Sequence, residues 1–145
     1  MKNILVPLDF SSASEGILQT AVSLAQALDA RLVLLHVLQP IITAGDPLLD
    51  ASQIAATQAA SDQFARTELA RVHEQLQRQG LAVEKELRDG PAAATILDLA
   101  RGLPADLIVM GSHGHTALYD LLLGSTSHAV VKGAPCPVVI VPSKS

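Results

Sequence analysis

The sequence predicts an α/β domain of three layers, in which helices cover both faces of a five-stranded parallel sheet. Short apolar runs of strand length alternate with amphipathic helical patterns along the chain. Continuous apolar runs are typical of strands that are buried on both faces, and strand–helix alternation produces parallel crossovers. The chain has 145 residues and no low-complexity linker, so we expect a single domain over residues 1–145.

Five segments carry a strand pattern. Four of them are nearly continuous apolar runs, whereas the third alternates apolar and polar residues as an edge or half-exposed strand does. The expected strands are 4–8, 31–37, 81–87, 106–110 and 137–141. Because side chains alternate along a strand, Val138 and Ile140 should point to one face of the sheet and Val139 and Val141 to the other.

Two helices are predicted before the middle of the chain. The first should begin at a capping box formed by Ser12 and Glu15, which would satisfy free N–H groups at the helix start. Its apolar face is formed by Ile17, Ala21, Leu24 and Leu28. The second helix is long and ends at Gly80. Its apolar face is formed by Ala65, Leu69, Val72 and Leu76.

Two further helices and one loop complete the pattern. A third helix opens at Gly90–Pro91, where the missing N–H of proline costs nothing, and presents Ile96, Leu99 and Leu103. A short fourth helix is expected over 125–132, stopped by Gly133. The segment 40–50 contains two prolines and a glycine and is expected to be a surface loop.

Composition excludes several classes of function. The formal net charge of −4 argues against a nucleic-acid-binding surface, which needs clustered Lys and Arg. The single cysteine, Cys136, excludes an intramolecular disulfide and any CxxC site, and we expect it to be a buried structural thiol. No apolar run is long enough for a membrane span or a secretory signal, so a cytoplasmic setting is expected.

Two glycine segments stand where a ligand would bind. In an open α/β sheet, ligands lie at the carboxyl ends of strands. Gly111 and Gly114 follow the fourth strand, and Gly124 precedes the fourth helix. Each glycine would allow a tight turn and close approach of a ligand. The hydroxyls and N–H groups of residues 125–127 could then form a phosphate site at a helix N-terminus. An ordinary loop followed by a serine-capped helix is the alternative.

Several common nucleotide and hydrolase motifs are absent. The sequence contains no Gly-x4-Gly-Lys-Ser/Thr, no Gly-x-Gly-x-x-Gly after the first strand and no Gly-x-Ser-x-Gly. A P-loop NTPase, a dinucleotide-binding fingerprint and an α/β-hydrolase elbow are therefore not predicted.

The motif Gly111-x2-Gly114-x9-Gly124-Ser125 resembles the nucleotide-binding signature of the universal stress protein family, in its ATP-binding subgroup. Four more segments resemble that family in the same order along the chain. They are 4–11, 34–37, 105–111 and 134–138. The resemblance implies a Rossmann-like, adenine nucleotide alpha-hydrolase-like fold with strand order 3-2-1-4-5. It also implies homodimers and a role in stress survival.

The resemblance also implies a binding site for ATP or another adenine nucleotide. Pro7, Leu8 and Asp9 would then line the first loop, with Asp9 near the ribose or a Mg²⁺ ion on the phosphates. The backbone around Val37 would meet the adenine edge, and Met110 and Gly111 would line the nucleoside. Phosphates would be held by Gly114, Gly124, Ser125, Thr126 and Ser127, with His113 beside them.

Binding through backbone donors and hydroxyls leaves ATP hydrolysis slow or absent. Phosphoryl transfer needs a positioned water and stabilisation of the transition-state charge, and neither an arginine finger nor an obvious general base is evident. Mg²⁺ commonly keeps waters and uses one or two carboxylates, which fits Asp9. We therefore expect an ATP-dependent sensor or switch in the stress response, with weak ATPase activity at most.

Two alternatives remain open from the residues. His113, His115 and His128, with Asp9 or Asp120, could bind Zn²⁺ or Ni²⁺ instead. The chain could also be a dimeric interaction module whose nucleotide site is not essential. In that case the apolar last strand, Val138–Val141, would pair with its copy, because an exposed apolar edge invites pairing.

Overall fold

The computed structural model describes residues 2–40, 48, 50–112 and 123–143. Nine elements alternate as predicted. The strands are β1 (Lys2–Pro7), β2 (Ala30–Leu38), β3 (Val83–Asp89), β4 (Leu107–Gly111) and β5 (Val138–Val141). The helices are α1 (Ser14–Leu28), α2 (Ala51–Arg78), α3 (Ala92–Gly102) and α4 (Ser125–Gly133). The bounds predicted for the five strands and for the last three helices agree with the observed bounds to within two residues.

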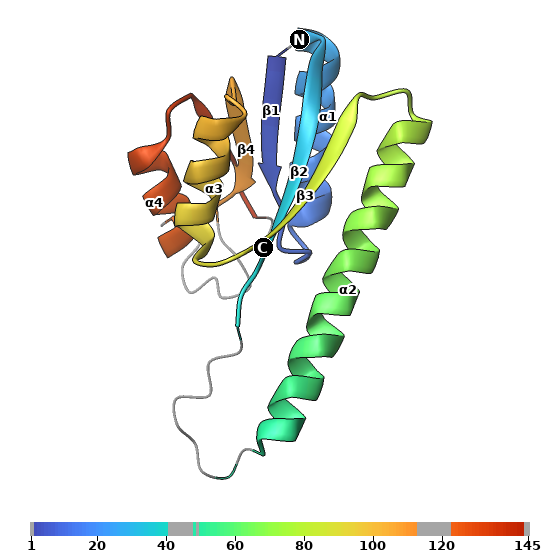
Figure 1. Cartoon of the computed structure of the whole chain (residues 1–145). Coiled ribbons are helices and arrows are strands. Elements are labelled where there is room, and N and C mark those ends of the chain that lie inside the picture. Colours follow the sequence, from blue (N-terminus) through green and yellow to red (C-terminus); the bar gives the residue numbers. More distant parts are fainter. Residues whose placement is uncertain (1, 41–47, 49, 113–122, 144–145) are drawn as a thin grey trace.

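The five strands form one parallel sheet in the order β3-β2-β1-β4-β5. The predicted order is therefore confirmed, with β1 in the centre and β3 and β5 at the edges. In Figure 1 the strand arrows point toward the same end of the molecule. The carboxyl ends of the strands thus share one edge of the sheet.

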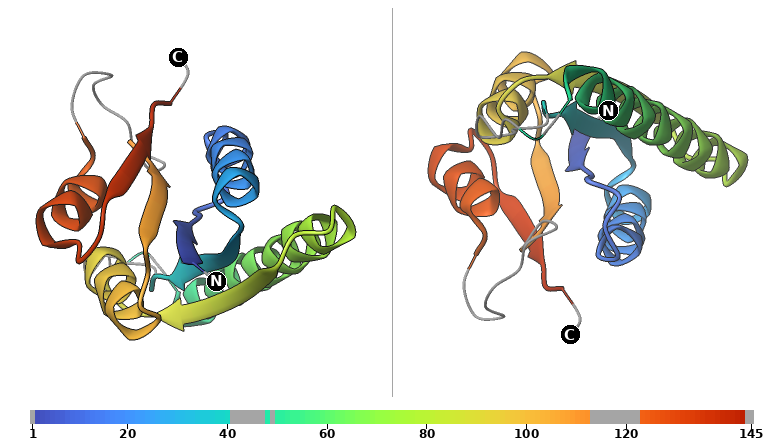
Figure 2. Two further views of the ribbon diagram at one scale, coloured as in Figure 1. Left: turned by 90° about the horizontal axis from the view of Figure 1, so that it is seen from above. Right: turned by 90° about the horizontal axis from the view of Figure 1, so that it is seen from below.

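Alternating side chains divide the core between the two faces of the sheet. Even-numbered residues of β1 and β2, such as Ile4 and Leu34, pack with α1 and α2. Odd-numbered residues, such as Leu5 and Val33, pack with α3 and α4. Figure 2 shows these two pairs of helices on opposite sides of the sheet. The three-layer prediction is confirmed, and burial of aliphatic side chains on both faces stabilises it.

The edge strands differ in character, as the sequence pattern predicted. β3 is charged at most positions, with the sequence Val-Glu-Lys-Glu-Leu-Arg-Asp. In β5, Val139 and Val141 pack toward α1, whereas Val138 and Ile140 pack on the opposite face. The predicted alternation of β5 is therefore confirmed.

The predicted start of the first helix is wrong. Ala13, not Ser12, is the N-cap residue of α1, and no side chain caps this end. Instead, the Asp9 carboxylate accepts a hydrogen bond from Ser11 N–H at 2.9 Å, and Ser11 O accepts from Ser14 N–H at 3.1 Å. These bonds order the backbone before the helix, and the side chain of Ser12 stays exposed.

The predicted apolar face of α1 needs one further correction. Leu28 is 43% exposed, and the buried position in the last turns belongs to Ala25. Leu28 is the last residue of the helix, and the C-cap residue Asp29 has a left-handed backbone with φ 52° just before the chain enters β2. In α2 the four predicted apolar residues are all buried.

Two remaining expectations have a simple outcome. Most of the loop predicted over 40–50 falls outside the described residues. Within the described part of the chain, no helix combines the length and the apolar character that a membrane crossing requires.

Candidate functional site

The order of the strands places a switch point beside β1. The chain runs from β1 outward through β2 and β3, and then crosses back to β4 on the other side of β1. Ile4 lies opposite Leu107 and Leu5 opposite Ile108, so β1 and β4 finish at the same edge. Ligands of open α/β sheets bind in the crevice at such a point. The predicted residues Pro7–Asp9 and Met110–Gly111 therefore come to one end of the molecule.

The N-terminus of α4 is fastened to the end of β4 through Ser112. Gly124 N–H donates to Ser112 O at 2.8 Å, and Ser112 N–H donates to Val141 O at 3.1 Å. Ser143 N–H donates to the Ser112 hydroxyl at 3.2 Å. These bonds join the ends of β4 and β5 to the first residue before α4. The predicted phosphate-binding helix start thus lies at the carboxyl edge of the sheet.

The first turn of α4 presents backbone N–H groups that the helix itself does not use. The first intrahelical bond runs from His128 N–H to Gly124 O at 2.9 Å. The N–H groups of Ser125, Thr126 and Ser127 precede it, so the helix provides no acceptor for them. The N-cap residue is Gly124, which has no side chain with which to cap this end. Such a terminus favours an anion through its free donors and the helix dipole.

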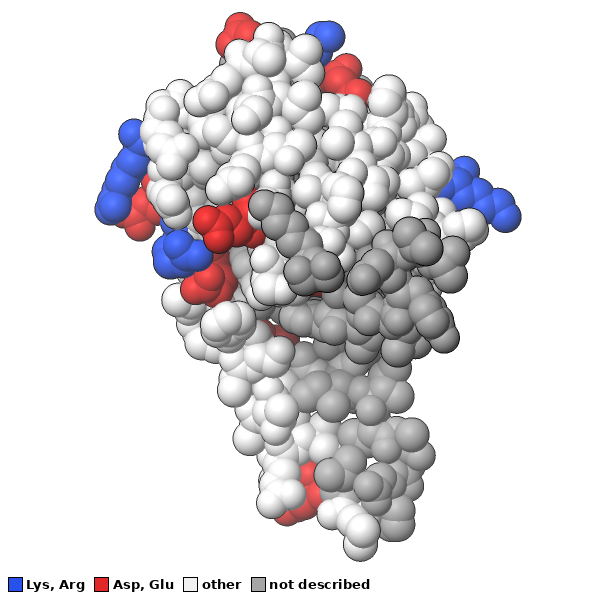
Figure 3. Space-filling model, turned by 180° about the vertical axis from the view of Figure 1, so that it is seen from behind, with Lys and Arg blue, Asp and Glu red and all other residues white. Residues whose placement is uncertain are grey.

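The first turn of α4 contains no Lys or Arg side chain. Lys132 lies in the last turn, about 10 Å from Ser125 at ~1.5 Å of rise per residue. Figure 3 shows the face turned away from the view of Figure 1, where Lys and Arg side chains lie apart along the margins. The groups that the start of α4 offers to an anion are therefore main-chain N–H donors.

Ser127 has a structural role in addition to its predicted one. Its side chain is 3% exposed, and its hydroxyl lies 2.9 Å from Gly111 O and 3.0 Å from Ser112 O. The single hydroxyl hydrogen is donated to these carbonyl oxygens, which anchors α4 to β4. The backbone N–H of Ser127 is then the group that this residue leaves for the predicted phosphate contact.

The tight-turn role predicted for Gly111 and Gly124 is wrong. Gly111 is a strand residue that pairs with Val141, and Gly124 has φ −65° and ψ 165°. Any residue adopts these conformations, so the backbone does not require glycine at either position. The close approach of a ligand, the other predicted reason for glycine, stays a prediction.

Val37 has the backbone orientation that the predicted adenine contact needs. Along β2, Leu32 and Leu38 bond toward β3, whereas Leu35 O accepts from Leu8 N–H of the β1 side at 2.8 Å. Because strand N–H and C=O groups alternate in direction, those of Val37 point to the β1 side. β1 ends at Pro7, so this part of β2 extends past its neighbour at the switch point.

The side chains of Leu8 and Met110 belong to the core. Leu8 is 4% exposed and packs on the α1 side of the sheet, whereas Met110 is 5% exposed and packs on the α3 side. Any contact of these two residues with a ligand would therefore come mainly from their backbones.

Some predicted site residues lie outside the described part of the chain. These are His113, Gly114, His115 and Asp120. Among the residues that are described, no three His, Cys, Asp or Glu side chains group as a metal site would need. His128 is exposed on α4. The metal-binding alternative rests mainly on residues that the structure does not describe.

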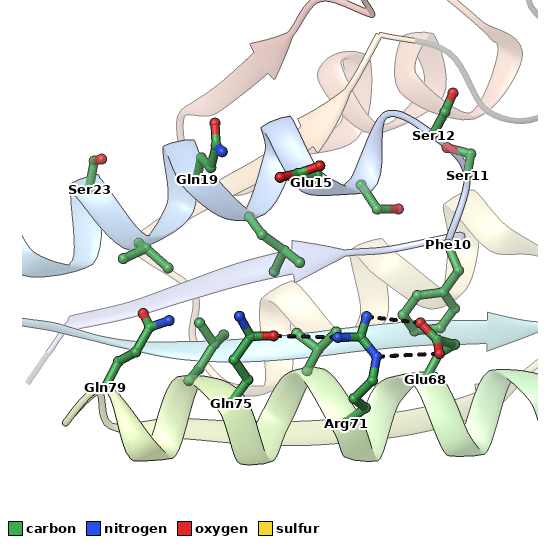
Figure 4. A pocket seen from close by; sticks show the side chains of 15 residues that line it. Phe10, Ser11, Ser12, Glu15, Gln19, Ser23, Glu68, Arg71, Gln75 and Gln79 are labelled. Carbon is green, nitrogen blue, oxygen red and sulfur yellow. Dashed lines mark hydrogen bonds and ion pairs between the residues drawn. The ribbon is translucent and has the colours of Figure 1, made fainter.

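A groove of about 950 Å³ lies between α1 and α2. Figure 4 shows Arg71 beside Glu68 and Gln75 on one wall and Gln19 and Glu15 on the other. The Arg71–Glu68 pair is 3.0 Å long and exposed, so it contributes little to stability. None of the predicted site residues lines this groove, and Phe10 marks its end nearest the loop after β1.

His36 is a residue near the site that the sequence pattern did not single out. It precedes Val37 on β2, and its Nδ1 lies 2.7 Å from Leu8 O. Only its position directly before a predicted contact could have drawn attention to it.

Comparison with known proteins identifies a family. Residues 1–142 match the model of the Universal stress protein family. A universal stress protein of Thermus aquaticus is 37% identical over 142 residues, covering 97% of this chain and 98% of the relative. The structure of the universal stress protein UspA from Lactobacillus plantarum superposes with a TM-score of 0.79 at 29% identity, covering 97% of both chains.

Two more solved structures share the fold and were determined with nucleotides. A universal stress protein in complex with cAMP has a TM-score of 0.72 at 22% identity, covering 99% of this chain and 98% of its own. The universal stress protein from Archaeoglobus fulgidus in complex with dAMP has a TM-score of 0.66 at 22% identity, covering 97% of each chain. Both ligands are adenine nucleotides.

Proposed function

The chain belongs to the universal stress protein family, and on that premise we propose that it binds ATP or another adenine nucleotide as a sensor or switch in the stress response. One observation carries the proposal: the N-terminus of α4, whose N-cap is a glycine and whose first N–H groups have no acceptor within the helix, is fastened beside the end of β4 at the switch point. The complexes of related folds with cAMP and dAMP support the choice of an adenine nucleotide.

The described residues fit such a ligand from its phosphates to its base. The N–H groups of Ser125, Thr126 and Ser127 would hold phosphate oxygens, and Gly124 would leave space for them. The backbone of Val37, directed past the end of β1, would meet the adenine edge, since backbone N–H and C=O are the complementary groups for a base. Gly114 and His113, which the sequence predicts at the site, would complete the phosphate contacts.

Mg²⁺ with Asp9 is part of the proposal. The Asp9 carboxylate accepts a hydrogen bond from Ser11 N–H at 2.9 Å, which orients it in the loop after β1. The ion would supply the positive charge that the start of α4 lacks, and it commonly binds through one or two carboxylates and waters. Asp9 would hold it near the phosphates.

Hydrolysis of ATP is proposed to be slow or absent. Main-chain donors at a helix start bind the ground state, whereas rapid phosphoryl transfer also needs a base or water-positioning group and added transition-state charge. A protein that holds ATP without consuming it can report nucleotide supply. We place this activity in the cytoplasm, where ATP is available and a lone thiol such as Cys136 stays reduced.

Calorimetric titration with ATP and Mg²⁺ tests the proposal, together with mass analysis of any nucleotide released when fresh protein is denatured. Gly124→Val should abolish binding, because the branched side chain would occupy the phosphate space. Its φ of −65° suits valine, so the fold should persist. Gly102→Ala is the matched control, since an added Cβ there meets nothing within 4 Å. Wild-type affinity in Gly124→Val would reject the phosphate site.

We further propose that the chain forms a homodimer through β5. The strand Val138–Val141 is a half-buried apolar edge, whereas the opposite edge, β3, carries five charged residues among its seven. Charges on an edge strand discourage pairing, and an apolar edge permits it. A two-fold axis would then join two β5 strands into one continuous sheet.

A further inference from the structure

Leu8, the first residue of the loop after β1, is held by two successive residues of β2, Leu35 and His36. Leu8 N–H donates to Leu35 O at 2.8 Å, and Leu8 O lies 2.7 Å from Nδ1 of His36. A carbonyl oxygen only accepts, so Nδ1 of His36 must carry the hydrogen. Both backbone groups of Leu8 are therefore bonded to β2, directly before Asp9.

The residue on the other side of Asp9 also contacts His36. The rings of Phe10 and His36 have centroids 5.1 Å apart and are tilted by 32°. Phe10 has a left-handed backbone with φ 58°, which is unusual for a bulky residue. Such a conformation persists only where the surroundings hold it. The imidazole of His36 and the core beneath α1 are the surroundings in contact with this ring.

We propose that His36 is a positioning residue for the nucleotide site: it holds the loop so that Asp9 stands at the switch point. This inference rests on the function proposed above. Asp9 lies between two residues that both contact the same imidazole, one through its carbonyl and one through its ring. The Asp9 carboxylate is then fixed further by its bond to Ser11 N–H at 2.9 Å. His36 thus orders the loop without touching the ligand.

Two substitutions separate the hydrogen bond from the ring contact. His36→Phe keeps an aromatic ring beside Phe10 but removes the donor to Leu8 O. His36→Asn removes the ring and keeps an amide N–H close to the position of Nδ1. His73→Phe is the matched control, because Nε2 of His73 lies 3.1 Å from another backbone carbonyl, that of Val83, which is the first residue of β3 and so lies at the amino edge of the sheet.

Affinity for ATP with Mg²⁺ is the first readout, measured by calorimetry on the full chain. We expect His36→Phe to weaken binding about tenfold, the factor that one good hydrogen bond contributes. His36→Asn should recover to within about threefold of the wild type if the bond is the main positioning contact. The control His73→Phe should leave the dissociation constant unchanged, whatever it does to stability.

Nuclear magnetic resonance supplies a second readout that does not depend on nucleotide. The nitrogen-15 chemical shifts of the His36 ring should show a hydrogen on Nδ1, as the contact with Leu8 O requires. The Ser11 amide should exchange with solvent faster in His36→Phe than in the wild type, because the loop that holds its Asp9 acceptor is released. Fast exchange at Ser11 in the His73 control would point to general loosening and would overturn the proposal.

The outcomes separate this inference from the function on which it rests. If the wild type binds no adenine nucleotide, the proposed function fails, and Ser11 exchange alone decides whether His36 positions the loop. If the wild type binds, both the affinity and the Ser11 exchange must change in His36→Phe. An unchanged value of either one would overturn the role proposed for His36.

Discussion

The hydroxyl of Ser127 lies 2.9 Å from the carbonyl oxygen of Gly111, and this contact joins the first turn of α4 to the last residue of β4. The two residues are 16 positions apart in the chain. Because the helix is held from its buried side, its first N–H groups remain directed along the axis toward the edge of the sheet. The anchor and the groups that we propose to bind an anion are therefore different atoms of the same turn.

Replacing Ser127 by alanine should lower the free energy of unfolding by about 1–2 kcal/mol, since two buried carbonyls lose a shared donor. Urea unfolding monitored by circular dichroism measures the change. Ser125→Ala is the control, because Ser125 is exposed in the same helical turn and should change stability by less than about 0.5 kcal/mol. Equal losses in the two variants would contradict the anchoring role.

Sequence patterns predicted the fold well because they report burial on a regular period. The apolar runs in β1, β2 and β4 are nearly continuous because both faces of these strands are covered, and β3 alternates because it is a half-exposed edge. The strand order itself came from the family resemblance. Periodicity does not specify which nearby polar group satisfies a helix start, so it predicts Ser12 as the cap although Asp9 and Ser11 order the backbone there.

Residue types in the sequence predicted the candidate site, but they did not predict which atoms of its residues make structural contacts and which are left for a ligand. The hydroxyl of Ser127 is directed to Gly111 only because α4 packs over the end of β4, which is a long-range contact. The role of His36 likewise depends on β1 lying next to β2 in a register that brings Leu8 beside it. A motif gives the residues in a loop, whereas tertiary packing decides which atom of each faces the ligand.

The amino end of the sheet should affect stability without affecting binding. Asn3 accepts from Arg31 at 2.8 Å through its side chain, donates to Pro104 O at 3.1 Å, and its N–H donates to Asp106 at 2.8 Å. It thus joins β1, β2 and the segment before β4. Asn3→Ala should lower the free energy of unfolding by about 1–2 kcal/mol, because Arg31 and Pro104 O lose their side-chain partner, whereas the backbone bond to Asp106 remains.

Urea unfolding and ATP titration together check this prediction for Asn3. The affinity for ATP should be unchanged, since Asn3 lies at the end of β1 opposite the switch point. Glu84→Ala provides the comparison, as it removes only the half-exposed ion pair with Arg31 and should cost less than about 1 kcal/mol. A loss of affinity in Asn3→Ala would show that the two ends of the sheet are coupled.

Cys136 should react slowly at neutral pH. Partial burial, followed by the negative charge of Asp106, raises the pKa of its thiol above the ordinary value. The thiolate is the reactive form, so alkylation by iodoacetamide at about pH 8 should be slower than in the urea-unfolded chain. Asp106→Asn removes the charge and should speed the native reaction. Equal rates in native and unfolded protein would contradict the prediction.

The raised pKa of the Cys136 thiol also predicts the direction in which the free energy of unfolding changes at alkaline pH. A thiol whose pKa is raised by folding stabilises the native state fully below its unfolded pKa, and this contribution is lost as the pH rises through the folded pKa. The free energy of unfolding should therefore decline above about pH 8.5. In Cys136→Ser that decline should be shallower, as denaturant titrations at several pH values can measure. An identical decline in both proteins would contradict the assignment to Cys136.

The proposed dimer leads to the last prediction. Val139→Lys places a charge on the β5 edge, where a paired copy would have to bury it, so sedimentation should shift from the mass of a dimer to that of a monomer. The long apolar stem of lysine can follow the face of the sheet while its ammonium group reaches water, and unchanged far-UV circular dichroism checks that the fold persists. Asp89→Lys is the control, because it places the same side chain at the exposed end of the opposite edge, β3, and should leave the mass unchanged. A dimer that survives Val139→Lys, or one that is lost in Asp89→Lys, would contradict pairing through β5.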